Sequence, residues 1–213
     1  MRDSSHCGLL LNIVAYVTDE FMSVAYICAM DWEADCLPDT ANVFVAGIGV
    51  ERAKQAAQKA CDEGASLLVS FGSAGGLAPN LVTGDLVVSA YAVQASEPGL
   101  QDTQQSLLEE PDHLKSVVTA LLKLSPTLGS IYSSHHVLNE LQQKQDAYSS
   151  TNALAVDMES AIIQRVCKNN SCLFLAVRVV LDDAHSVMPQ VLVSACDDYG
   201  HVLFGKMART ILC

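Results

Sequence analysis

Three acidic side chains come directly after apolar runs of the sequence, at Glu33, Glu159 and Asp182. Each run has the character of a buried strand, and ligands of open α/β sheets bind beside the carboxyl ends of the strands. Carboxyl groups that converge at such an edge can transfer protons or bind hydroxyl groups. A structural interpretation stays open: Glu33 can compensate a helix dipole, and the other two can belong to a helix cap and a solvated turn.

A glycine-rich stretch is the second candidate element. Gly72-Ser73-Ala74-Gly75-Gly76 follows the strand expected over residues 66–71. Its backbone amides are not shielded by large side chains, so they can contact an anion, a sugar hydroxyl or a water. It lacks the Gly-Lys-Ser/Thr of a Walker A loop. Gly47-Ile48-Gly49 has Arg52 where a dinucleotide-binding loop has its third glycine, so a tight strand-to-helix turn explains it equally well.

The sequence gives little support for other kinds of site. It contains no Gly-x-Ser-x-Gly elbow, which disfavours a serine hydrolase triad. His135-His136 has no acidic or cysteine partner at metal-ligand spacing, and the eight cysteines form no CxxC pair. We therefore predict no metal site and no cofactor. Because the cysteines lie far apart and mostly in apolar runs, we expect reduced thiols in a cytoplasmic protein.

Composition narrows the choice of partner. The chain has 213 residues, half of them hydrophobic, which suits one domain with a sizeable core. Its formal net charge of −12 repels phosphate backbones and anionic membrane surfaces. We therefore predict a small-molecule ligand and no nucleic-acid partner.

The N-terminal segment is predicted to lie outside the fold. The apolar stretch over residues 7–17 is too short to span a bilayer, and no small-residue cleavage site follows it. We predict that residues 1–21 are an N-terminal extension, that residues 22–213 form the domain, and that no segment spans a membrane.

Strand and helix patterns alternate from residue 22 onward, with no linker and no repeat. This order predicts a single α/β domain with a largely parallel sheet. Strands are expected at 24–30, 43–46, 66–71, 86–93, 129–134, 153–156 and 173–181. Helices are expected from 31, from 50 to a stop at Gly64, from Pro111, within 135–148, from an N-cap at Asp157 to about 168, and from Pro189, with a long loop at 94–110.

Four blocks of the sequence carry a resemblance to a known family. They are Ala29-Met30-Asp31-Trp32-Glu33; Gly47-Ile48-Gly49 with Ala53; Gly72 to Leu77 with Gly84 to Val88; and Val156-Asp157-Met158-Glu159 with Arg178 to Asp182. In order and spacing the chain from Ser23 to about Pro189 resembles the nucleoside phosphorylase and nucleosidase superfamily. It is most similar to the methylthioadenosine/S-adenosylhomocysteine nucleosidases and to the phosphorylase-like enzymes of hopanoid biosynthesis.

The resemblance implies a fold and an assembly. The fold is a three-layer α/β/α sandwich around a central mixed, partly barrel-like sheet. The assembly is a homodimer or a larger homo-oligomer. The partner is a small-molecule nucleoside, and no cofactor or metal is implied.

The resemblance also implies roles for the acids. Asp182 matches the aspartate that donates a proton to N7 of a purine, and Glu33 matches the glutamate that activates water. Glu159 matches the glutamate that binds ribose hydroxyls, with Met158 packed on the sugar. Whether Asp182 holds its proton before substrate binds stays open, because an aspartate of ordinary strength is ionised at neutral pH.

The remaining matched positions surround the nucleophile and the base. Ser73, with Ala74 and Gly75, falls where the family positions the nucleophile, and Val137 and Leu138 fall where it lines the base pocket. The chain departs from the nucleosidase pattern in having Val137 in place of a phenylalanine and His135 in place of an aspartate. Both changes weaken the inference that adenine is the base.

Water or phosphate as nucleophile separates a nucleosidase from a phosphorylase. Fixed arginines hold a phosphate dianion, and phosphorylases of this superfamily commonly place one just before the glycine-serine stretch. Ser70 and Phe71 stand there instead. We therefore expect hydrolysis of the N-glycosidic bond of a purine nucleoside. A phosphorylase, including one of the adenosylhopane type, and a non-catalytic nucleoside-binding protein are the alternatives.

Overall fold

The computed structural model describes residues 23–94 and 124–186. The predicted N-terminal extension, the loop after residue 94, the helix from Pro111 and the helix from Pro189 lie outside these described residues. All statements below concern the two described ranges.

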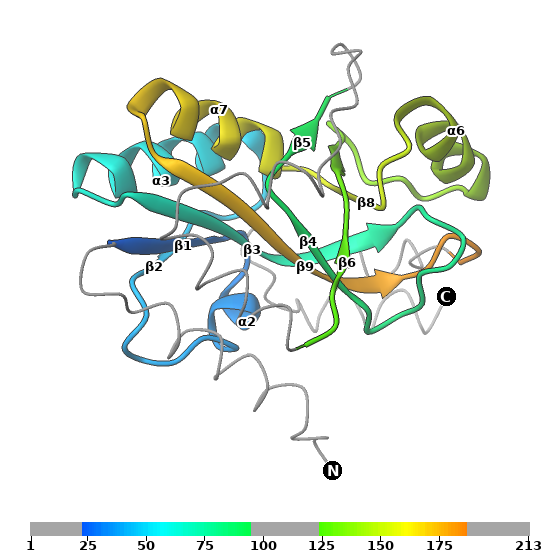
Figure 1. Cartoon of the computed structure of the whole chain (residues 1–213), viewed down its shortest axis with the longest axis horizontal. Coiled ribbons are helices and arrows are strands. Elements are labelled where there is room, and N and C mark those ends of the chain that lie inside the picture. Colours follow the sequence, from blue (N-terminus) through cyan, green and yellow to red (C-terminus); the bar gives the residue numbers. More distant parts are fainter. Residues whose placement is uncertain (1–22, 95–123, 187–213) are drawn as a thin grey trace, which may run out of the picture.

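A curled sheet forms the centre of the molecule (Figure 1). Its strand order is β5-β7-β8-β3-β9-β4-β6, with β1 also paired to β3 and β2 paired to β1. Six of the strand pairs are parallel and two are antiparallel, β3 with β8 and β4 with β9. The bounds are β1 Val24–Cys28, β2 Val43–Val45, β3 Leu67–Gly76, β4 Leu86–Ser89, β5 Ala92–Val93, β6 Thr127–Leu128, β7 Ile131–Ser133, β8 Ala155–Asp157 and β9 Leu173–Asp182.

The sheet curls because β3 changes its neighbour along its length. Its first residues pair with β1, its last two pair with β8 on the same edge, and β9 follows it on the other edge throughout. The expectation of a largely parallel, mixed and partly barrel-like sheet is therefore confirmed. The expectation that this strand ends at residue 71 is wrong. β3 continues through Gly76, because β8 and β9 supply hydrogen-bonding partners on both sides of the glycine-rich stretch.

Helices cover both faces of the sheet and complete the three layers. The helices α3 (Val50–Asp62) and α7 (Ser160–Asn170) lie side by side on one face, and the short helix α2 (Asp31–Ala34) lies on the other (Figure 1). Helix α6 (Leu141–Thr151) follows β7. It corresponds to the helix expected within residues 135–148. Within the described ranges, none of the helices has the length and apolar run needed to cross a bilayer.

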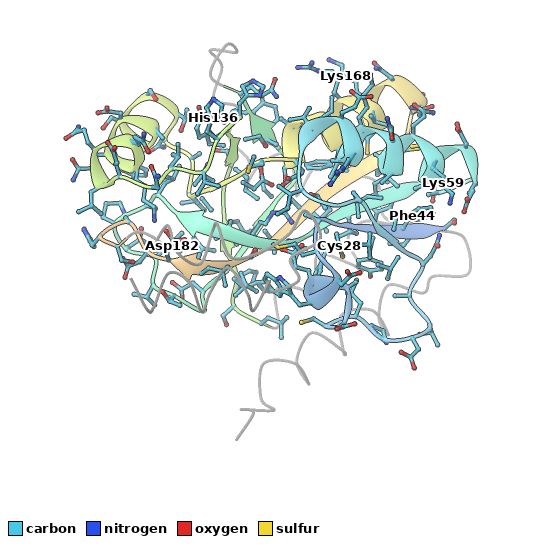
Figure 2. The ribbon with its side chains drawn as sticks, turned by 180° about the vertical axis from the view of Figure 1, so that it is seen from behind. Cys28, Phe44, Lys59, His136, Lys168 and Asp182 are labelled. Carbon is cyan, nitrogen blue, oxygen red and sulfur yellow. The ribbon has the colours of Figure 1, made fainter. Side chains whose placement is uncertain are left out.

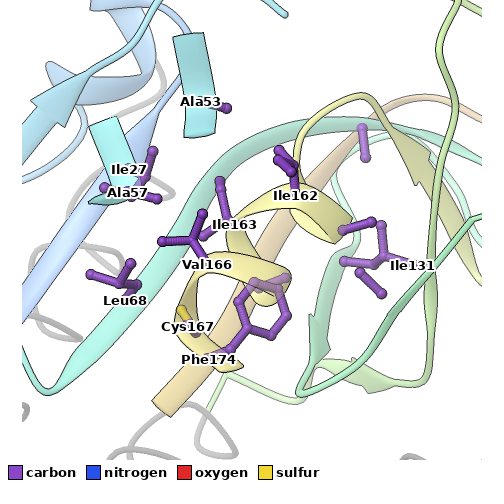
Figure 3. Packing of buried hydrophobic residues seen from close by; sticks show 14 of the residues in the cluster. Ile27, Ala53, Ala57, Leu68, Ile131, Ile162, Ile163, Val166, Cys167 and Phe174 are labelled. Atoms are coloured by element: carbon purple, nitrogen blue, oxygen red, sulfur yellow. The ribbon is translucent and has the colours of Figure 1, made fainter. Parts of the chain in front are cut away.

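The main hydrophobic core lies between the sheet and the pair α3 and α7 (Figure 3). Helix α3 packs closely because it presents only small side chains, with Ala53, Ala57 and Ala60 fully buried. At its far end Lys59 of α3 lies over the Phe44 ring of β2, 5.7 Å from the ring centre (Figure 2). The connection between β2 and α3 contains Gly49, whose amide bonds to Glu159 in the site described below.

Three further element boundaries differ from the sequence prediction. The strand expected over 86–93 is two short strands, β4 and β5, and the one expected over 129–134 is the shorter strand β7, with β6 just before that range. The N-cap of α7 is Glu159 rather than Asp157, which ends β8. The Asp157 carboxylate nevertheless accepts the Ser160 amide, 3.2 Å away, so it still bonds to the first turn of the helix.

Candidate active site

A cavity of about 330 Å³ lies at the carboxyl ends of β1, β3, β8 and β9. The structure brings every predicted site residue to its wall, from α2, the end of β3, the loop between β7 and α6, the turn between β8 and α7, and the end of β9. These residues are Glu33, Ser73, Ala74, Gly75, Val137, Leu138, Met158, Glu159 and Asp182. Segments up to 149 residues apart in the sequence thus surround one hollow.

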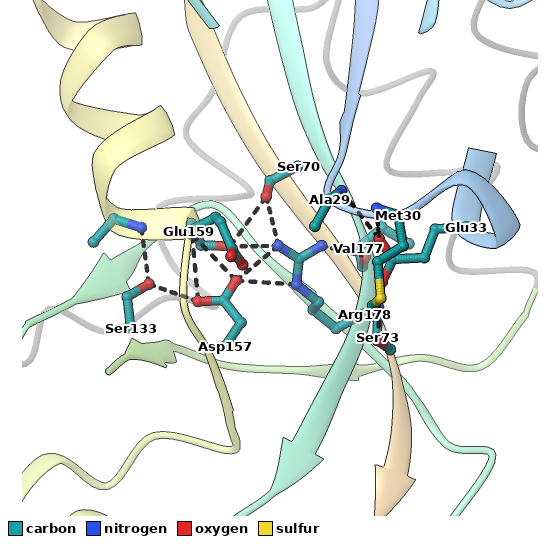
Figure 4. A network of polar contacts seen from close by, with 12 residues as sticks. Ala29, Met30, Glu33, Ser70, Ser73, Ser133, Asp157, Glu159, Val177 and Arg178 are labelled. Atoms are coloured by element: carbon teal, nitrogen blue, oxygen red, sulfur yellow. Dashed lines mark hydrogen bonds and ion pairs between the residues drawn. The ribbon is translucent and has the colours of Figure 1, made fainter. Parts of the chain in front are cut away.

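Glu33 is held rigidly by four hydrogen bonds. Its Oε2 accepts the backbone N–H groups of Ala29 and Met30, both at 3.1 Å. Its Oε1 accepts the N–H of Ser73 at 2.8 Å and the Ser73 hydroxyl at 2.9 Å (Figure 4). Since a carboxylate has about four lone-pair positions, all of them are occupied in this geometry. The serine hydroxyl is the only one of the four donors that can rotate away.

The glycine before Ser73 makes this close approach possible. A Cβ atom at Gly72 would lie 2.5 Å from Oε1 of Glu33, well inside van der Waals contact. Any larger residue at this position would therefore displace the carboxylate or the strand. The glycine-rich stretch thus admits a buried glutamate, in addition to exposing amides as the sequence suggested.

Glu159 is the acid whose ionisation the site disfavours. Burial, and then the neighbouring charge of Asp157, raise the pKa of Glu159 to about 7, although the Gly49 amide donates to its Oε1 at 3.0 Å. Gly49 can turn its amide inward because its φ of 118° lies in a region that favours glycine. Near neutral pH the Glu159 carboxyl is therefore divided between its neutral and charged forms.

A buried ion pair lies against the cavity and was missed in the sequence analysis. The Nε and Nη2 atoms of Arg178 donate to Oδ2 of Asp157 at 3.0 and 2.7 Å. Nη2 also donates to the hydroxyls of Ser70 and Ser160, at 2.6 and 3.1 Å, and Ser133 donates to Oδ1 of Asp157 at 2.6 Å (Figure 4). Only 4% of Arg178 and 7% of Asp157 is exposed, so the network is closed to solvent.

The charges in this network sustain each other. Burial alone would lower the pKa of Arg178, but the negative charges of Asp157 and Glu33 outweigh it and raise that pKa above its ordinary value. One signal in the sequence could have revealed the pair. Arg178 is the only charged residue between Leu173 and Leu181, and a charge inside a buried strand needs a partner.

A β-bulge directs Asp182 into the cavity. Ala74 pairs with Val180 in the β3–β9 ladder, but the next residue of β3, Gly75, pairs with Asp182. Leu181 is therefore the extra residue, and the bulge turns the side chain that follows it. The Asp182 carboxylate lies over Gly75, whose missing Cβ would be 3.4 Å from Oδ1.

The mouth of the cavity is apolar. Trp32, Val137 and Leu181 line it and are 40%, 45% and 38% exposed. His136 also lines the cavity, although the sequence analysis treated it as part of an ordinary loop. The site thus has charged groups at its base and apolar side chains around its opening.

Comparison with known proteins identifies the family. A sequence profile of the Phosphorylase superfamily matches residues 39–196, most of the chain. The chain belongs to the phosphorylase superfamily. The chain is 30% identical over 137 residues to the 5′-methylthioadenosine/S-adenosylhomocysteine nucleosidase of Baumannia cicadellinicola. The matched region covers 58% of this chain and 59% of the relative. The nucleosidase of the same name from Thermotoga maritima is 30% identical over 112 residues, 52% of this chain and 51% of the relative.

The match therefore spans only between half and three-fifths of the length of these two relatives. Solved structures of the superfamily share the fold more completely. The Campylobacter jejuni 5′-methylthioadenosine/S-adenosyl homocysteine nucleosidase superposes with a TM-score of 0.62 at 20% identity, covering 89% of this chain and 96% of the other. The futalosine hydrolase of Helicobacter pylori gives 0.60 at 18% identity, covering 78% and 86%. At such identities the likeness concerns the fold.

The Arg178–Asp157 pair generates a prediction about stability. Asp157→Asn leaves a buried guanidinium without its counter-charge, and we expect the free energy of unfolding to fall by about 3–5 kcal/mol. Urea denaturation followed by circular dichroism measures it, and Asp39→Asn, at an exposed position, is the control.

The double variant Asp157→Leu/Arg178→Met removes both charges and should be less destabilised than Asp157→Asn alone. A change of less than about 0.5 kcal/mol for Asp157→Asn, the usual range of surface substitutions, would contradict this view of the pair.

Proposed function

We propose that this member of the phosphorylase superfamily cleaves the N-glycosidic bond of a purine nucleoside with water, as a nucleosidase of the methylthioadenosine/S-adenosylhomocysteine type. One observation carries the proposal: Glu33, Glu159 and Asp182 line the same cavity, each held by different neighbours. The names of its relatives and structural neighbours support the same class of reaction.

The chemistry requires acids on both sides of the breaking bond. Cleavage places positive charge on the ribose and leaves the electron pair of the C1′–N9 bond on the base. Asp182 gives a proton to N7 of the departing base, and Glu159 accepts hydrogen bonds from the ribose hydroxyls, with Met158 against the sugar. A water oxygen bonds to C1′ and its proton passes to Glu33. The products are the free base and the sugar, with its 5-substituent, bearing a 1-hydroxyl. Glu33 then releases its proton to solvent and Asp182 takes one up, which restores both groups for the next turnover.

The hydrogen bonds of Glu33 indicate how water enters this scheme. All of its lone-pair positions are occupied, so a water can reach it only when the Ser73 hydroxyl rotates away from Oε1. Ser73 would then donate to, or accept from, the same water. The backbone amide of Ser73 keeps the carboxylate in place during this exchange. In this scheme Ser73, with Ala74 and Gly75 beside it, positions the attacking water.

Phosphate is the second candidate nucleophile, because one arginine, Arg178, does line the cavity. Its Nε and Nη2 atoms are already engaged by Asp157 and by the two buried serines. A phosphate dianion at this end of the cavity would also face the carboxyl groups of Glu33 and Glu159. These two facts favour water over phosphate.

The direct test is a panel of purine nucleosides, including 5′-methylthioadenosine and S-adenosylhomocysteine, assayed for release of free base with phosphate present or withheld. We expect release without phosphate. Asp182→Asn should lower kcat by about 10²–10⁴-fold, because a positioned general acid contributes that much. Asp62→Asn, on the exposed surface of α3, is the matched control. Strict dependence on phosphate would favour the phosphorylase alternative, and unchanged turnover in Asp182→Asn would exclude Asp182 as the acid.

The raised pKa of Glu159 predicts a pH dependence. Ribose hydroxyls donate most effectively to an ionised carboxylate, and Glu159 is ionised only above its pKa of about 7. We expect kcat/KM to rise with pH through an apparent pKa near 7. Glu159→Gln should lower kcat/KM and remove this rise. A rise of the same shape in the Glu159→Gln variant would assign it to another group.

The assembly and location of the protein stay predictions. A homodimer or larger homo-oligomer would cover the exposed apolar side chains Trp32, Val137 and Leu181 at the mouth of the cavity. Sedimentation at micromolar concentration tests this, and a monomer would contradict it. The cytoplasmic location rests on the expectation of reduced thiols.

A further inference from the structure

Lys144 is a buried cation that the sequence analysis passed over. It lies in α6, a helix in which only Lys144 and Ala147 are buried, and its side chain is 1% exposed. An ammonium group is almost never buried this fully unless it is paired and hydrogen-bonded, because desolvation costs too much. The groups that accept hydrogen bonds from Lys144 therefore indicate its role.

Within the described residues, the hydrogen bonds of the ammonium group all go to one short segment, residues 182–186. Nζ donates to Oδ2 of Asp182 at 2.5 Å, to the carbonyl of Asp183 at 2.6 Å and to the carbonyl of Ser186 at 2.9 Å. The Asp182 carbonyl is a fourth acceptor at 3.3 Å. Because an ammonium has three donors, this segment uses all of them.

The segment needs such an anchor because the sheet ends there. β9 stops at Asp182, and the turn that follows has few bonds of its own: the His185 amide donates to Oδ1 of Asp183 at 2.9 Å, and the Ser186 amide to the Asp183 carbonyl at 3.3 Å. Asp182 thus sits at the end of a strand, just past a bulge. In the described residues, Lys144 of α6 ties this turn to the body of the molecule, in addition to the pairing of Asp182 with Gly75 of β3.

We propose that Lys144 is a positioning residue for the general acid: it fixes the Asp182 carboxyl group and the turn at 182–186 in the orientation that proton transfer to the base requires. This inference rests on the proposed function and adds to it a residue that touches neither base nor sugar. With Oδ2 bonded to the ammonium, Oδ1 is the oxygen left for the base.

The ammonium also matches the charge that the reaction produces. When Asp182 has given its proton to N7 it is a carboxylate, and Lys144 lies in direct contact with it. The same turn also carries the Asp183 carboxylate, which accepts from the His185 amide. Lys144 is therefore the cation positioned to stabilise the deprotonated acid, and its loss should act on kcat more than on KM.

The experiment is a double-mutant cycle on kcat with Lys144→Met and Asp182→Asn. In the wild-type background we expect Lys144→Met to lower kcat by about 10–100-fold, the cost of a misplaced catalytic group, with a small change in KM. In the Asp182→Asn background it should lower kcat by less than about threefold, because the acid it positions is already lost. Lys144→Arg, which keeps the charge, should recover part of the rate.

Lys168→Met is the matched control, since Lys168 is an exposed lysine on α7 at the opposite end of the molecule from Asp182 (Figure 2). A kcat within threefold of wild type for Lys144→Met would overturn the proposal. An equal fractional loss in both backgrounds would also overturn it, because a purely structural role does not act through Asp182. Should Lys144→Met fail to fold, Lys144→Gln, which keeps one donor group, takes its place in the cycle.

A second measurement needs no substrate. Amide hydrogen exchange at residues 185 and 186 should accelerate at least tenfold in Lys144→Met relative to Lys168→Met, and unchanged exchange would show that Lys144 does not hold the turn.

The failure of the proposed function and the failure of the proposed role of Lys144 give different results. If wild-type protein releases no base from any nucleoside, the proposed function is wrong, and exchange alone then decides whether Lys144 holds the turn. If Asp182→Asn loses activity and Lys144→Met does not, only the role of Lys144 is removed.

Discussion

The parallel pairing of β3 with β9 is the constraint on which the rest of the site depends. This pairing places Arg178 opposite Gly72 and, after the bulge, Asp182 opposite Gly75. Glycines on one strand thus face charged residues on the other. The space that the absent side chains leave is occupied by the Glu33 carboxylate at one position and approached by the Asp182 carboxylate at the other. The glycines of β3 beside the two charged residues of β9 leave room for several carboxyl groups in a small volume.

The carboxyl groups of the site differ in the cations and hydrogen-bond donors that contact them. This difference suits them to different roles in the reaction. Asp157 is paired with Arg178, and Asp182 with Lys144. Glu33 accepts four hydrogen bonds, and its carboxylate makes no ion pair within the described residues. Glu159 has a single backbone donor in the described residues, and burial raises its pKa to about 7. An environment that treats neighbouring carboxyl groups differently is what acid–base chemistry at neutral pH requires.

Local patterns in the sequence predicted the positions of the acids well. An apolar run that stops at an acid is a signal contained in about ten residues. Glu33 lies in the short helix after β1, Glu159 lies just after β8, and Asp182 is the last residue of β9. The glycine-rich stretch was placed outside the strand because its extended form depends on β8 and β9, which lie some 80 and 100 residues further along the chain. The intrinsic preferences of the residues in this stretch carry no information about pairing strands so far away in the sequence.

The cations were missed for the same reason. Arg178 is 21 residues from Asp157, and Lys144 is 38 residues from Asp182. Lys144 in particular lies in a helix of polar composition, where a lysine normally points to solvent. Only the approach of α6 to the end of β9 turns it into a buried counter-charge. The sequence therefore predicted the groups that face a ligand better than the groups that hold them in place.

The central claim is that these acids direct water to C1′ of a nucleoside, and the fate of isotopic oxygen tests it most directly. The nucleoside that the wild-type protein cleaves fastest is incubated in H₂¹⁸O, and the sugar product is reduced at once with borohydride to stop exchange at C1. Mass spectrometry should then find one ¹⁸O atom per ribitol formed, in equal amount to the base released. Base release with an unlabelled sugar, or with ribose 1-phosphate as the product, would contradict the account.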